Sequence, residues 1–286
     1  MKKSILLLAT LCLLVSLPAL AQQQESTTST EKKKLHGTFF VNWGYHRDAY
    51  TTSTIQFKDI ETPGVPHYDF KFRKAKAHDK LDMNDFFKTA PTVPQYAFNF
   101  GYFFNDKNDL GIEVAWNHLK YVVTDNQVMR MTGTIDGQYY DLDTLVTPGF
   151  VHFEHTNGNN YLLISILKRK QLLSSRNNQH KLSAVFSLGG GVLIPKSDSY
   201  ITINNEQYHN DGPFRVSGWV VGAGVSLRYD FFKYFFFEPR INGAFVNYTS
   251  VKLYEKGRAK HTFFSVQSIL SLGINVPLGH GKLFGN

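Results

Sequence analysis

The chain has 286 residues, a formal net charge of +8 at pH 7, 15% aromatic residues and 22 glycines. Its single cysteine, Cys12, falls in an N-terminal apolar stretch that we expect to be removed, which excludes disulfides, thiolate nucleophiles and thiolate metal sites from the mature protein. After that stretch no apolar run is long enough for a transmembrane helix, so a membrane location would require a closed barrel of strands.

The N-terminal region predicts export. Residues 1–21 have the pattern of a secretory signal peptide: Lys2 and Lys3 precede an apolar run, and Ala19 and Ala21 provide the small residues of a cleavage site. Residues 22–34, QQQESTTSTEKKK, are polar and of low complexity, which predicts a disordered segment. We expect residues 35–286 to form one β-barrel domain with a short C-terminal tail.

From residue 35 onward, large apolar residues alternate with small or polar ones at a period of two, which predicts β-strands. Each expected strand has the roughly 9–11 residues that a tilted membrane strand needs. The eight expected strands cover residues 36–50, 95–104, 110–123, 160–173, 181–195, 214–230, 235–248 and 261–276.

The connections between these segments alternate between long and short. The second, fourth and sixth are short turns, at NDKND (105–109), SSRNNQ (174–179) and FFKY (231–234). The first, third, fifth and seventh are long, and we expect their strand-like pieces to extend the wall as hairpins, at residues 68–77, 128–135 with 139–145, and 199–205. Outer-membrane barrels have this alternation, with long loops outside and tight turns in the periplasm. Both chain ends are then expected on the periplasmic side.

The hairpin of residues 214–248 decides which face is inside. Large apolar residues such as Trp219, Val225 and Leu227 occupy one face of its first arm, whereas the other face carries mainly glycine, serine and valine. Small uncharged residues make a poor water-exposed surface but fill the narrow interior of an eight-stranded barrel. We therefore expect the large apolar residues to face lipid. The aromatic residues of segment 231–235 are expected to form a girdle at the inner interface.

In these features the chain resembles the small eight-stranded outer-membrane barrels, the OmpA/OmpX-like group, over residues 36–276. The stretches FFVNWGYHRDAYTTSTIQF, WNHLKYVV, FVHFEHTNGNNY and GGGVLIPKSDSY are similar to a Bacteroidota-type branch of such barrels, a branch of unassigned function. The resemblance implies an all-β, eight-stranded antiparallel up-and-down barrel in a Gram-negative outer membrane, assembled by the barrel-assembly machinery. One departure is that the tail PLGHGKLFGN follows the last strand, where many such barrels end on an aromatic residue. We expect a monomer without a cofactor, and nucleic acid is implausible as the partner of an exported barrel.

Four charged residues fall on the expected interior face: Glu113, Arg228, Glu238 and Arg240. An unpaired charge is costly in a low-dielectric interior, so we expect them to pair in a salt-bridged plug that fills the barrel. The alternative is a gated ion path or a proton-linked site. Eight strands enclose little more than side chains, which disfavours an open pore.

The first long loop carries a basic run, consisting of Lys71, Arg73, Lys74, Lys76 and Lys80. Lipopolysaccharide carries phosphates, so a basic rim would attract it by simple Coulomb forces. The alternative is a solvated loop of mixed charge, because four aspartates lie among these residues.

A second class of function is a lipid A-modifying enzyme, which would use a histidine, a serine and an acid near the outer rim. The candidates are His118, His152, His155, His261, Ser265, Glu154 and Asp143. The deacylase pattern of His, one residue, then Ser-Asn does not occur, and the stretch 155–157 matches it only loosely. A general base and its nucleophile must touch, which a sequence does not show. A further alternative is that His152 and His155 lie on one strand face and bind a metal ion. Otherwise they are exposed loop histidines without a role in binding.

A third class is a carrier of small apolar molecules through a lateral opening. Its one indication is Pro239 on the lipid face, because proline removes a ladder hydrogen bond. A β-bulge explains this proline equally well. The sequence therefore favours a non-enzymatic outer-membrane barrel with a structural or surface-interaction role through its long loops.

Overall fold

The computed structural model describes residues 37–80, 95–104, 110–177, 179–232 and 234–278. The expected signal peptide, the polar segment 22–34, the turn 105–109 and the tail from residue 279 lie outside the described residues. No helix long and apolar enough to cross a membrane occurs among the residues that the structure describes.

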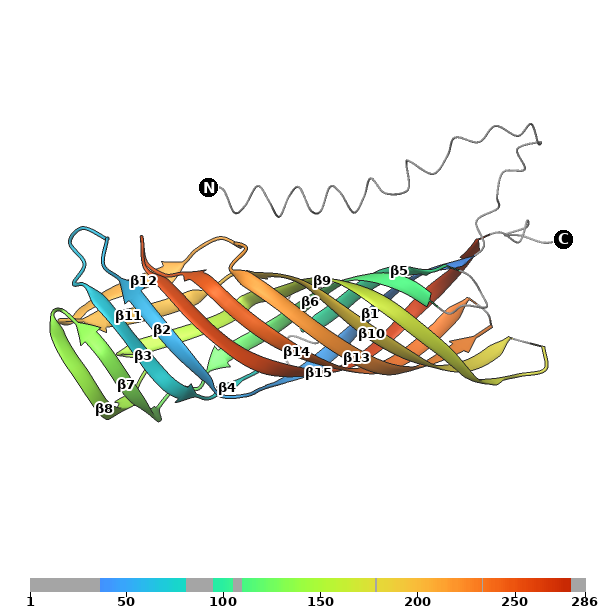
Figure 1. Cartoon of the computed structure of the whole chain (residues 1–286), viewed down its shortest axis with the longest axis horizontal. Helices are drawn as coiled ribbons and strands as arrows, with labels where there is room; N and C mark the ends of the chain where they lie inside the picture. Colours follow the sequence, from blue (N-terminus) through green and yellow to red (C-terminus); the bar gives the residue numbers. More distant parts are fainter. Residues whose placement is uncertain (1–36, 81–94, 105–109, 178, 233, 279–286) are drawn as a thin grey trace, which may run out of the picture. The chain divides into compact units, whose positions relative to one another are not determined.

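Eight long strands close into a ring in which every neighbouring pair is antiparallel (Figure 1). In order around the ring they are β1 (Gly37–Tyr50), β5 (Tyr96–Phe103), β6 (Leu110–Val123), β9 (Val151–Ser174), β10 (His180–Pro195), β13 (Gly218–Phe231), β14 (Phe235–Lys252) and β15 (Arg258–Leu278). The first and last strands close the ring, with Gly37 opposite Leu278. The expected eight-stranded up-and-down barrel is confirmed.

The alternation of side chains places the large apolar residues outside, as the sequence predicts. The three tryptophans, Trp43, Trp116 and Trp219, are 36–42% exposed on the outer surface. Their strand neighbours Asn42, Asn117 and Val220 are at most 2% exposed on the inside. Other outward apolar residues complete a belt around the ring, among them Phe98, Phe100, Ile112, Ile164, Ile166, Phe186, Leu188, Leu227, Ile241, Phe264, Leu270 and Leu272. Exposure of such a large apolar surface to water is unfavourable, whereas the hydrocarbon core of a membrane would cover it.

Seven further strands build an extension at the end of the ring that carries the long connections (Figure 1). They are β2 (Ser53–Asp59), β3 (Tyr68–Ala75), β4 (Ala77–His78), β7 (Gln127–Ile135), β8 (Gln138–Val146), β11 (Asp198–Ile203) and β12 (Glu206–Asp211). One run of pairs joins β15, β2, β3, β7 and β8, and another joins β9, β11 and β12. The expected hairpins form, as β2 with β3, β7 with β8 and β11 with β12, and β3 pairs in addition with β7 from a different connection. Main-chain hydrogen bonds therefore tie the long connections to one another.

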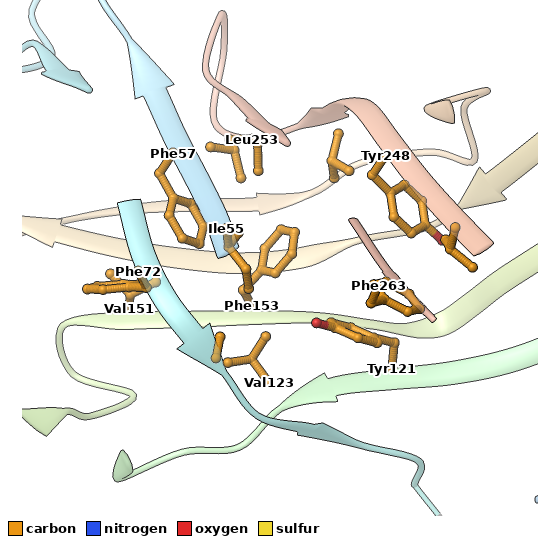
Figure 2. Packing of buried hydrophobic residues seen from close by; sticks show 14 of the residues in the cluster. Ile55, Phe57, Phe72, Tyr121, Val123, Val151, Phe153, Tyr248, Leu253 and Phe263 are labelled. Carbon is orange, nitrogen blue, oxygen red and sulfur yellow. The ribbon is translucent and has the colours of Figure 1, made fainter. Parts of the chain in front are cut away.

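The extension has a hydrophobic core that continues into the adjoining part of the ring, whereas polar side chains occupy much of the middle of the ring interior. Phe57, Phe70 and Phe72 are at most 1% exposed, and their rings pack 5.3–5.8 Å apart. Phe153 from β9 packs at 5.4 Å on Phe57, which joins the extension to the wall (Figure 2). Burial of these rings removes large apolar areas from water, and this is the main source of stability for the extension.

Several strand bounds differ from the sequence predictions. Strand β9 begins at Val151 rather than at residue 160, and β13 begins at Gly218 rather than at residue 214. Pro239 is not at a β-bulge, because β13 and β14 keep one register on both sides of it and only the pairs between Ser226 and Tyr229 are missing. The proline removes a hydrogen bond without shifting the strand.

Candidate functional site

Two charged pairs meet inside the ring. Arg240 of β14 donates two hydrogen bonds to Glu113 of β6, with N–O distances of 2.6 and 2.9 Å. The same guanidinium reaches Glu238 at 2.8 Å. The other carboxylate oxygen of Glu238 lies 3.6 Å from Arg228 of β13. All four side chains are at most 6% exposed, so each buried charge has an opposite charge beside it.

Arg228 closes the end of the barrel where the short turns lie. Its guanidinium carbon is 3.4 Å from the ring centre of Phe236 and 4.8 Å from that of Phe40. Asp230 accepts a hydrogen bond from it at 3.3 Å, and Asn275 accepts another. A cation over aromatic faces is stabilised where water is excluded. The sequence candidates did not include Asp230, although a step of two from Arg228 places it on the same face.

Amide side chains fill the next part of the interior. Asn99 donates to Asn42 at 2.7 Å, and Asn117 donates to Gln267 at 3.3 Å. A cavity of about 30 Å³ remains beside Glu113 and Gln267. This volume holds about one or two water molecules. Side chains thus fill the barrel from the turn end through its middle.

A buried histidine pair lies at the end of the ring interior that is next to the extension. The Nε2 atoms of His155 and His261 are 3.3 Å apart, and the hydroxyl of Ser197 is 2.7 Å from Nδ1 of His155. Contact between a serine and a histidine is the geometry of an activated nucleophile. However, His155 has no exposed surface and Ser197 is only 6% exposed, so the hydroxyl is closed to substrate. Burial lowers the pKa of His155 to about 3, which keeps the ring neutral.

Sequence reasoning named both of these histidines but missed Ser197, which follows β10 in a connection without periodicity. The other candidates occupy different places. His118 faces outward and contacts Asn160 at 2.9 Å, Ser265 is 1% exposed inside the ring, and Asp143 is exposed on β8. The structure therefore does not bring these three together as a triad.

His152 and His155 do not share a strand face, so the structure does not support the alternative of a metal pair at these two residues. His152 lies at the surface between Asp125 at 3.1 Å and Glu154 at 3.4 Å, whereas His155 lies in the core. Among the described residues no group of three or more His, Cys, Asp or Glu side chains is placed so that it could hold a metal ion.

The pKa of His152 gives a first testable prediction. Its hydrogen bond to Glu154, with a second to Asp125, raises the pKa of His152 to about 9 despite partial burial. A histidine pKa raised above its unfolded value contributes stability that is fully present below about pH 6.5 and is lost as the pH rises through 9. NMR titration of the imidazole is expected to give a midpoint near 9, and Glu154→Gln should move it towards 6.5. A wild-type midpoint near 6.5 would contradict the ion pair.

The outer face of the extension carries a basic groove of about 550 Å³. Lys71 and Arg73 point into it because they alternate along β3 with the core residues Phe70 and Phe72. Arg130 on β7 lies directly across the strand pair from Arg73. The groove is lined by Gln56, Asp69, Lys71, Arg73, Arg130, Thr132, Gly133, Tyr139 and Asp141.

Charges in the groove are only partly balanced. Asp69 pairs with Lys58 at 3.0 Å, and Asp141 pairs with Arg130 at 2.8 Å. No ion pair joins Lys71 or Arg73 to an acid within the described part of the chain. The groove therefore offers two exposed cationic side chains, Lys71 and Arg73, beside Arg130, which already pairs with Asp141.

Of the five basic residues named from the sequence, only Lys71 and Arg73 line the groove. Lys74 and Lys76 are exposed elsewhere on the segment, and Lys80 lies 3.8 Å from Glu154. Arg130 was missed, because its place beside Arg73 depends on pairing between strands from different connections.

A closed antiparallel ring of eight strands, an apolar belt outside and a charged interior together define a small transmembrane β-barrel of the bacterial outer-membrane type. No protein-family model matches the sequence, and no curated protein matches it.

Among solved structures, the fold is similar to that of the outer membrane protein OprG from Pseudomonas aeruginosa, with 9% identity and a TM-score of 0.39, covering 85% of this chain and 98% of that one. Neisserial surface protein A matches with 10% identity and a TM-score of 0.35, covering 83% and 98%. The attachment invasion locus protein Ail of Yersinia pestis matches with 12% identity and a TM-score of 0.30, covering 84% and 99%. These likenesses concern the barrel fold alone.

Proposed function

We propose that the protein is a closed, non-enzymatic outer-membrane barrel that presents its extension as a binding surface for the phosphate groups of lipopolysaccharide. The observation that carries this proposal is the juxtaposition of Arg73 and Arg130 across β3 and β7, with Lys71 beside them. Like charges directly opposite each other destabilise a strand pair. An anion in the groove would offset this repulsion, and guanidinium groups bind phosphate with two hydrogen bonds.

The filled interior supports a function outside the lumen. Arg228, Arg240 and their partners occupy the section that an ion would have to cross. Moving these buried, paired charges aside would leave carboxylates without partners, at a high free-energy cost. The extension, in contrast, is built on a packed core that holds the groove residues at fixed positions.

The binding experiment uses the full mature chain in detergent and purified lipopolysaccharide, with affinity measured by titration calorimetry at low and high salt. The double variant Lys71→Gln/Arg73→Gln is expected to bind roughly tenfold more weakly, since each charge-assisted hydrogen bond is worth about 1.5–3 kcal/mol before screening. Binding by the wild type should weaken at high salt, because exposed charges are screened.

The matched control is Lys74→Gln/Lys76→Gln, which removes the same charge from the same segment outside the groove. It should bind like the wild type. Equal losses in both double variants would indicate attraction by net charge and would contradict the groove as a site. Single-channel conductance of the wild type in planar bilayers would contradict the closed barrel.

A further inference from the structure

Strand β8 forms a free edge of the extension. It pairs with β7 on one side, and no strand among the described residues pairs with its other side (Figure 1). The two strands keep one register along the whole of β8, without a bulge. A long edge of this kind is a template for another strand, and proteins usually blunt it with lysine, proline or a bulge. Strand β8 has none of these features.

The hairpin turn fixes which main-chain groups of β8 remain without a partner. Asp136 and Gly137 have φ angles of +50° and +77°, as the two central residues of a type I′ turn do. This turn makes Ile135 and Gln138 a hydrogen-bonded pair, and such pairs recur at every second residue of an antiparallel ladder. The main-chain amides and carbonyls of the alternate residues therefore point to the free edge, and the described residues offer them no main-chain partner. We call these the edge residues of β8: Tyr139, Asp141, Asp143 and Leu145.

The side chains of β8 are less covered than those of its neighbour β7. Leu142 and its cross-strand partner Met131 both face the core side of the sheet. Leu142 is nevertheless 41% exposed, whereas Met131 is 5% exposed. On the outer face Leu145 is exposed beside Val128. A further strand would cover Leu142 and Leu145 and would bond the free main-chain groups at the same time.

The two aspartates of β8 determine which strand fits this edge. Asp141 and Asp143 share one cation, Arg130, at 2.8 and 3.5 Å, so one negative charge is in excess. A second copy of β8 is a poor partner. Every antiparallel register that joins at least three of the four edge residues puts an aspartate opposite an aspartate. Like charges directly opposite each other destabilise a strand pair.

We propose that the free edge of β8 binds an extended basic segment of another protein, which adds to the extension as a further antiparallel strand. Each residue of the segment that bonds an edge residue then lies on the outer face of the sheet. Lysine or arginine at these positions balances the charge of Asp141 and Asp143, and apolar residues between them cover Leu142. This inference does not depend on the lipopolysaccharide groove.

The probe is a capped, fluorescently labelled peptide of alternating valine and lysine that is as long as β8. Fluorescence anisotropy measures its affinity for the full mature chain in detergent. We expect this peptide to bind and its valine–glutamate counterpart not to bind. Methylation of the lysine main-chain amides, which donate to β8, should abolish binding. Methylation of the valine main-chain amides, which point away from β8, should be tolerated.

Asp143→Pro and Asp143→Ala are a matched pair of variants. Both remove the same charge, but only proline removes the amide that points to the free edge, a position where an edge strand tolerates proline. Asp143→Pro is expected to bind the peptide roughly tenfold more weakly than Asp143→Ala does. In the wild type, hydrogen exchange measured by NMR should show that the peptide protects the amides of the four edge residues.

Three results would overturn the proposal. Absence of binding by the lysine peptide, or equal binding by the glutamate peptide, would exclude a basic segment. Equal affinities of the two Asp143 variants, or of the two methylated peptides, would leave only attraction between side-chain charges. A wild-type dimer in analytical ultracentrifugation that Asp143→Pro dissociates and Asp143→Ala does not would assign the edge to a second copy of this chain. The methylated peptides decide the question on the wild type even if Asp143→Pro does not fold.

Discussion

The Arg240→Met substitution is expected to lower the free energy of unfolding of the barrel by roughly 3–5 kcal/mol, as removal of one partner from a buried ion pair does. Arg240 makes hydrogen bonds to both Glu113 and Glu238, which are at most 1% exposed. Methionine fills much of the same space but leaves two carboxylates buried beside each other. The measurement is the urea midpoint of the detergent-folded protein, together with the temperature at which its compact band in SDS gels disappears.

Two further variants isolate the charge effect. Arg47→Met removes an arginine whose side chain is 57% exposed, and its partner Asp79 keeps hydrogen bonds from the backbone of Asp48 and the amide of Gln95, so the loss should be no more than about 1 kcal/mol. The triple variant Glu113→Gln/Glu238→Gln/Arg240→Met removes all three charges and should recover most of the lost stability, because neutral polar groups cost less to bury. If Arg240→Met alone were as stable as Arg47→Met, the interior pairs would contribute nothing to folding.

The ring itself was predictable because the alternation of side chains along a strand does not depend on which strand lies beside it. A residue such as Trp116 and its neighbour Asn117 point to opposite faces whatever the partner strand is, so composition alone shows which face meets lipid. The same argument places Glu113 and Arg240 inside. It does not show that they touch, because β6 and β14 lie on opposite sides of the strand order.

The extension and the first part of β9 were not predictable in the same way. The cross-strand pair of Arg73 and Arg130 requires two separate connections to meet, and periodicity within each one carries no information on that pairing. The bulge at residues 156–158 disrupts alternation in β9, so the sequence suggested a strand that starts only at residue 160. In both places the alternation along a single strand does not determine the structure.

The Phe57→Ala substitution is expected to open the extension while leaving the ring closed. Phe57 is 1% exposed and packs on Phe70, Phe72 and Phe153, so its truncation should cost roughly 3–5 kcal/mol. Strand β2 pairs with β15 only over Lys58 to Gln56, so few hydrogen bonds hold it once the core is lost. The ring keeps its own ladder between β1 and β15.

Limited trypsin digestion measures this separation, because Lys58, Lys71 and Arg73 lie on the strands that would loosen. Phe57→Ala should be cut within β2 and β3, yet its unboiled band should still migrate as a folded barrel. Val128→Ala, at a residue 68% exposed on β7, is the control and should resist trypsin like the wild type. The opened variant should also lose lipopolysaccharide binding in the groove. Loss of the folded barrel together with the extension would show that the ring and the extension unfold as one unit.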